Sequence, residues 1–145
     1  MGTAYEQDFY AWAREQAGLL RTGRLSEADL ENIAEEIESM GRSEKRELVS
    51  RLTVLLLHLL KWQFQPGLRR ASWEASIKVQ RIRLDGHLTD NPSLRPQIPD
   101  AMRMAFEVAL IEAAAETGLA QSIFPQACPW SFELAIENGF WPNQA

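Results

Sequence analysis

The chain has 145 residues, of which 46% are hydrophobic and 24% charged, values that are typical of one folded domain and that exclude a disordered chain. No apolar run approaches the length of about 18 residues that a membrane-spanning helix needs, and the first residues lack the features of a signal peptide. Because Cys128 is the only cysteine, no internal disulfide can form, and we expect a cytoplasmic protein.

The net charge of −5 is distributed unevenly along the chain. Residues 1–50 carry six Lys and Arg against eleven Asp and Glu, residues 51–95 carry eight against three, and residues 96–145 carry one against six. This acidic–basic–acidic order allows the helices to neutralise one another when they pack. It also allows the basic middle to face a polyanion or an acidic partner.

Apolar residues at helical spacing predict a first helix over residues 4–21, after which Gly23 suits a left-handed cap. A second helix is predicted over residues 26–40 and should end at Gly41. The third, over residues 43–64, is apolar nearly all round, so we expect the other helices to surround it. Two further helices are predicted over residues 72–88 and 99–117. An extended strap over residues 119–130 follows, and a short last helix is predicted over residues 131–138.

No segment shows the sustained alternation of apolar and polar residues that marks a strand, so we expect no sheet. The short connections between long helices favour antiparallel neighbours. The predicted fold is therefore all-α. We expect a single domain over residues 1–145, an antiparallel bundle of about five to six helices with an extended C-terminal strap.

The sequence contains no known catalytic signature. Phosphate-binding glycine loops, the GxSxG elbow and the HExxH and ExxH metal motifs are all missing. Cys128 lies between Ala127 and Pro129, with no His or Lys nearby to activate its thiol. We expect no metal and no cofactor, and we favour a protein that is not an enzyme.

One set of polar residues still needs an explanation. Glu31, Glu35 and Glu38 follow one another at helical spacing. Carboxylates in such a row repel one another unless nearby Lys or Arg side chains neutralise their charge. His58 lies in the most apolar helix, where a glutamate of the second helix is its predicted partner and should help the imidazole to hold a proton. With Arg81 these residues form a candidate polar cluster, and the glutamate row within it is a structural ion network, a solvated face, or a metal or acid/base site.

Two further groups are candidate surfaces. A basic surface is formed by Arg69, Arg70, Lys78 and Arg83, close in sequence to several aromatic residues, as in some nucleic-acid-binding proteins. However, the isoelectric point is near 5.1, and we do not expect nucleic acid to be the partner. Aromatic residues also gather near the C-terminus, where they either hold the strap to the bundle or form a partner interface: Trp130, Phe132, Phe140 and Trp141.

Six segments occur in an order that is typical of one protein family: DFYAWAREQAGLLRTGR (8–24), ENIAEEIESMGRSEKREL (31–48), HLLKWQFQP (58–66), SWEASI (72–77), DNPSLR (90–95) and FPQACPW (124–130). Over roughly residues 4–142 the chain resembles the bacterial domain-of-unknown-function 29 family. The resemblance implies an all-helical domain that usually makes up the whole protein. It implies no activity.

Three functions are compatible with the sequence. We favour an interaction or adaptor module that binds an unknown protein partner or associates with itself. The alternative is a helical protein, with or without enzymatic activity, that binds a metal or a small molecule with the candidate polar cluster. A weaker alternative is association with nucleic acid through residues 69–83.

Overall fold

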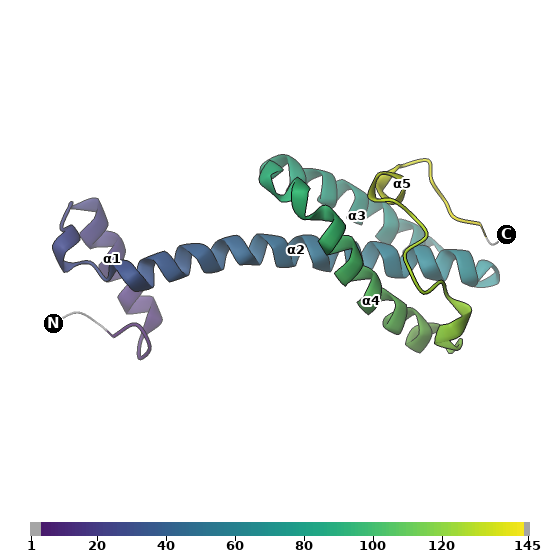
Figure 1. Ribbon diagram of the computed structural model, residues 1–145, viewed down its shortest axis with the longest axis horizontal. Coiled ribbons are helices and arrows are strands. Elements are labelled where there is room, and N and C mark those ends of the chain that lie inside the picture. Colours follow the sequence, from purple (N-terminus) through teal and green to yellow (C-terminus); the bar gives the residue numbers. More distant parts are fainter. Residues whose placement is uncertain (1–3, 144–145) are drawn as a thin grey trace. The chain divides into compact units, whose positions relative to one another are not determined.

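The computed structural model describes residues 4–143, and these residues contain five α-helices, four short 3-10 turns and no strand (Figure 1). The predicted all-α class is confirmed. By their internal contacts the residues form two compact units, the first ending at Ser43 and the second beginning at Glu44.

The first unit is a helical hairpin. Helix α1 spans Phe9–Arg21 and begins at Asp8, whose carboxylate accepts a hydrogen bond from the amide of Ala11. It ends at Gly23, whose φ of +73° is the left-handed conformation predicted for this position. The amide of Arg24 then returns to the carbonyl of Leu19, which satisfies one of the free carbonyls at the helix end. A 3-10 turn, η1 (Leu25–Glu27), leads into the next helix.

Helix α2 is one uninterrupted helix, Leu30–Phe64, and the prediction of two helices that separate at Gly41 is wrong. A glycine within a helix costs only about 1 kcal/mol relative to alanine, and no proline interrupts this stretch. Ser43 does not cap a new helix, because its hydroxyl donates to the carbonyl of Ser39 one turn earlier. α2 ends where Pro66 opens the short turn η2 (Pro66–Leu68).

The second unit packs α3 (Ala71–Asp90) and α4 (Ile98–Thr117) against the C-terminal half of α2. The turn η3 (Pro92–Gln97) joins α3 to α4. As expected for a helix that is apolar all round, α2 is buried on several sides. Its buried residues between positions 48 and 60 are Leu48, Leu52, Leu55, Leu56, Leu57, Leu59 and Leu60.

The strap predicted over residues 119–130 contains the turn η4 (Gln121–Ile123). It continues into the short helix α5 (Phe132–Ile136), and from here on "strap" means residues 119–143. Ser131 caps α5 by accepting a hydrogen bond from the amide of Leu134. The ring of Phe124 packs edge-on against Phe64 of α2 at 5.1 Å. The strap is therefore part of the packed second unit.

Candidate functional site

The three glutamates of the candidate polar cluster lie in the first unit, on the face of α2 that points to solvent. Glu31, Glu35 and Glu38 are all exposed. Glu35 pairs with Arg42 at 3.0 Å, and both side chains are more than half exposed. An ion pair this exposed contributes at most about 1 kcal/mol to the free energy of unfolding. The row is a solvated face with one ion pair along it.

His58 lies in the second unit and finds its partner within its own helix. Its Nδ1 donates to the carbonyl of Val54, one turn earlier, at 2.8 Å. Burial is the main reason that the pKa of this imidazole lies below its ordinary value. The expectation that a glutamate partner helps His58 to hold a proton is therefore wrong.

Arg81 is almost fully buried, with 3% of its surface exposed, and it holds the strap. Nε donates to the carbonyl of Ala135 at 2.9 Å, Nη1 to that of Asn138 at 3.4 Å and Nη2 to that of Phe140 at 2.7 Å. The guanidinium also lies 5.3 Å from the ring centre of Trp141. Arg81 and His58 thus have separate sets of partners, and neither set contains a carboxylate of the row.

The four residues of the predicted basic surface have different environments. Arg69 donates to the carbonyls of Trp62 and Pro142 and joins the strap to α2. Arg70 lies over the ring of Trp73, and Lys78 pairs with Glu74 at 3.6 Å. Arg83 is exposed on α3. Much of the positive charge in this segment therefore faces other parts of the same protein.

The aromatic residues near the C-terminus hold the strap to the second unit. Trp130 and Phe132 are each 8% exposed. The ring of Trp141 packs on Trp62 of α2 at 4.8 Å, and Trp130 packs edge-on against Phe140. Three of these four residues are thus engaged in ring contacts inside the protein, and Trp130 and Phe132 also line a cavity beside α4.

Sequence reasoning missed the second histidine. His87 is buried near the end of α3, where Nε2 donates to the carbonyl of Glu44 at 2.8 Å and Nδ1 lies 3.4 Å from the carboxylate of Glu47. The signal was its spacing: Gln80 and His87 are seven residues apart, on one edge of the apolar stripe of α3. His87 links the end of α3 to α2.

Sequence reasoning also missed a polar network within the hairpin. The indole N–H of Trp12 donates to the carboxylate of Asp29 at 3.0 Å, and Asn32 donates to the same group at 2.8 Å. The side-chain oxygen of Gln16 accepts from the backbone amide of Asp29 at 2.7 Å. The bonds from Asn32 and Trp12 keep the pKa of Asp29 below its ordinary value. Polar bonds therefore join α1 to the beginning of α2.

The hairpin leaves large apolar side chains on its surface. In the described part of the chain, fourteen large hydrophobic residues are exposed, and seven of them belong to the first unit. By contrast, only one of the 23 buried hydrophobic residues in the described part of the chain, Trp12, belongs to the first unit. By the 3.6-residue period of a helix, five of the seven lie on one side of their own helix. Their side chains are 41% to 68% exposed. We name these five residues the hairpin face: Phe9, Leu20, Leu30, Ile37 and Met40.

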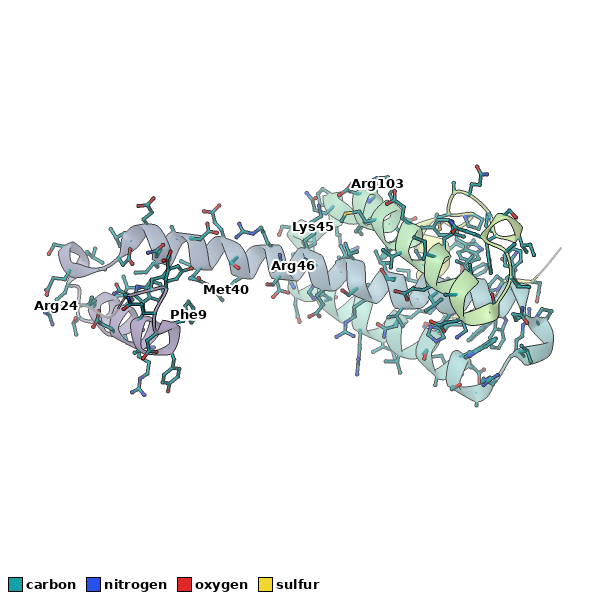
Figure 2. All side chains as sticks on the ribbon, turned by 90° about the horizontal axis from the view of Figure 1, so that it is seen from below. Phe9, Arg24, Met40, Lys45, Arg46 and Arg103 are labelled. Atoms are coloured by element: carbon teal, nitrogen blue, oxygen red, sulfur yellow. The ribbon has the colours of Figure 1, made fainter. Side chains whose placement is uncertain are left out.

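The hairpin face combines residues from both helices of the first unit. Figure 2 shows Phe9 of α1 and Met40 of α2 directed into the space between the two helices. Tyr5 packs edge-on against Phe9 and Trp12 and donates its hydroxyl to Glu36 of α2. This bond is the main reason that the pKa of Tyr5 is raised to about 12. Apolar surface and carboxylates are therefore neighbours here.

Two searches of the described residues gave negative results. Among residues 4–143, no three His, Cys, Asp or Glu side chains come together in a way that could hold a metal ion. Within the same residues, no helix combines the length and the apolar character that crossing a membrane requires.

Comparison with known proteins gives one finding. The family model described as "Domain of unknown function DUF29" matches residues 4–141, which confirms the resemblance found in the sequence. No curated protein and no solved structure matches the chain.

Proposed function

The chain belongs to the family of the domain of unknown function DUF29, and we propose that it is a non-enzymatic module that binds a partner protein through the hairpin face. The observation that carries this proposal is the contrast between the two units. Among the described residues, the second unit buries 22 hydrophobic residues and exposes seven large ones, whereas the first buries one and exposes seven.

The polar network explains how the hairpin keeps its form without an apolar core. Trp12, Gln16, Asp29 and Asn32 connect α1 to the beginning of α2 by hydrogen bonds. None of these hydrogen bonds uses a side chain of the hairpin face, although Phe9 also packs against the rings of Tyr5 and Trp12. Several large apolar side chains exposed on one side of their helices favour an interaction site on the protein surface.

The charge of the first unit defines the chemistry of the partner. Residues 1–43 contain four Arg and nine Asp or Glu, a net charge of −5, whereas residues 44–145 contain eleven of each sign. A second copy of the same hairpin would bring a further −5 to the interface, and the two would repel each other. We therefore assign the hairpin face to a helix of another protein that has an apolar stripe flanked by Lys and Arg.

A synthetic peptide tests this assignment. It is a fluorescein-labelled helix with leucine at positions i, i+3, i+4 and i+7 of each repeat and lysine elsewhere. We expect it to bind the full chain in fluorescence anisotropy, more weakly as salt is added. The same peptide with glutamate in place of lysine should not bind. Equal binding of the two peptides would overturn the charge argument.

Variants of the protein locate the binding surface. Replacing Ile37→Gln and Met40→Gln together removes two exposed apolar side chains and should weaken binding about tenfold or more. The matched control is Ile82→Gln with Ile111→Gln, on α3 and α4, where the side chains are 71% and 59% exposed. It should bind as the unaltered protein does. If both pairs weaken binding equally, the hairpin face is not the site.

The oligomeric state separates this proposal from self-association. We expect sedimentation equilibrium of the unaltered chain to give the mass of one copy. A dimer that dissociates in the Ile37→Gln, Met40→Gln variant would mean that a second copy occupies the hairpin face, and the assignment to a basic helix would be wrong.

A further inference from the structure

A cavity of about 490 Å³ lies in the second unit, between the first half of α4 and the segment that leads into α5. This volume is within the range of small-molecule sites in proteins, about 300–1,000 Å³. Its apolar lining includes Met102 and Phe106 of α4 and Trp130 and Phe132 of the strap. Each of these four side chains is at most 8% exposed, so residues of the core form the apolar part of the wall.

Four polar residues around the cavity, Arg103, Glu107, Cys128 and Ser131, form hydrogen bonds within the protein. Arg103 donates to Asp100 at 2.6 Å and to Glu107 at 3.3 Å. The hydroxyl of Ser131 accepts from the amide of Leu134, and the thiol of Cys128 donates to the carbonyl of Trp130 at 3.3 Å. A charged ligand would have to displace one of these bonds. A neutral ligand would leave all of them in place.

The cavity is also held open by its surroundings. Pro99 lies in the first turn of α4, and Pro125 and Pro129 fix φ in the strap. The strap is anchored beyond the cavity by the three hydrogen bonds of Arg81. A preformed cavity binds a ligand with less loss of conformational entropy than one that must open first.

We infer that this cavity binds a small neutral aromatic molecule, packed against the rings of Phe106, Trp130 and Phe132 and the thioether of Met102. Aromatic rings attract one another in edge-on and offset arrangements, and a methionine sulfur adds a favourable contact with a ring. The site is independent of the hairpin face, since all its lining residues belong to the second unit.

Two methionines on one helix provide the test. Met102 lines the cavity, whereas Met104 is 39% exposed and does not line it. With ¹³C-methyl methionine in the full chain, we expect indole, a neutral aromatic probe, to shift the Met102 methyl signal in a saturable manner and to leave Met104 in place. Indole-3-acetate, which carries a carboxylate, should bind at least about tenfold more weakly because its charge finds no unpaired cation. Equal shifts of both methyl groups, or no saturable shift at Met102, would overturn the inference.

A plugged variant and the thiol give independent readouts. Ala127 is exposed at the edge of the cavity, so Ala127→Trp should block indole without removing a core side chain. The matched control, Ala115→Trp, places the same side chain at an exposed site of α4 away from the cavity and should bind indole normally. At ten times its dissociation constant, indole should also slow alkylation of Cys128 by about tenfold. If the Ala127→Trp variant binds indole as the control does, the site lies elsewhere.

Discussion

The indole N–H of Trp12 and the carboxylate of Asp29 meet at 3.0 Å, and this bond joins the only buried hydrophobic residue in the described part of the hairpin to the beginning of α2. Asp29 accepts from Asn32 as well and therefore combines two roles, a cap for α2 and an anchor for α1. The two roles make the hairpin dependent on one side chain.

We expect Asp29→Ala to loosen the hairpin and to leave the second unit intact. Amide hydrogen exchange in α1 should become about fivefold faster or more, the scale expected for a lost N-cap bond. Exchange at core positions of α3 should not change. Equal acceleration in both helices would mean that Asp29 contributes to the stability of the whole chain rather than to the hairpin.

Gly41→Ala should stabilise the protein by about 1 kcal/mol, because alanine is the better helix former. A Cβ at this position meets no atom within 4 Å, and the backbone is not left-handed. Gly23→Ala is the contrasting variant. It should destabilise the hairpin, since φ is +73° there. Urea denaturation followed by circular dichroism measures both, and a loss of stability in Gly41→Ala would contradict the continuous α2.

His58 should make the protein less stable in mild acid. Burial lowers its pKa in the folded state, so the unfolded chain binds a proton more readily. The stabilisation is complete above the unfolded pKa of about 6.5 and is lost as the pH falls below it. The free energy of unfolding, measured from pH 8 to pH 5, should fall less steeply in His58→Gln. Parallel curves would show that His58 does not titrate differently in the two states.

Arg81→Met should lower the free energy of unfolding by about 3 kcal/mol, because three backbone carbonyls lose a charged donor. Arg83→Met, two residues away on the exposed side of α3, should change it by no more than about 0.5 kcal/mol. Denaturation in urea measures both variants. Similar losses would indicate that the positive charge of α3, rather than the bonds to the strap, is responsible.

The helices were predictable because their apolar residues recur every three to four positions, as Leu48, Leu52 and Leu59 do in α2. The continuity of α2 through Gly41 was not predictable, since Gly41 and Ser43 resemble helix-boundary signals and only the small cost of an internal glycine decides against a boundary. Local sequence also gave no indication that the strap would be tied to α3 by Arg81, because its acceptors are backbone carbonyls. Any residue provides those.

The candidate sites were less predictable than the helices for a related reason. Ile33 and Ile37 lie one helical turn apart, a spacing typical of a buried stripe, yet Ile37 is 63% exposed. Whether a stripe is covered depends on which helix lies over it, and the periodicity of one helix does not contain that information. His58 and His87 are equally difficult, because each bonds to a backbone oxygen that has no sequence signature.

The partners of Arg81 also set the order in which the second unit can be completed. The acceptors lie 54 to 59 residues further along the chain, so during synthesis α3 emerges long before the carbonyls that satisfy its buried guanidinium. Contacts of such long sequence separation form late in folding. Until residue 140 has been made, the nascent unit carries an uncompensated cation beside an uncovered leucine core, a state in which chaperones have a surface to bind.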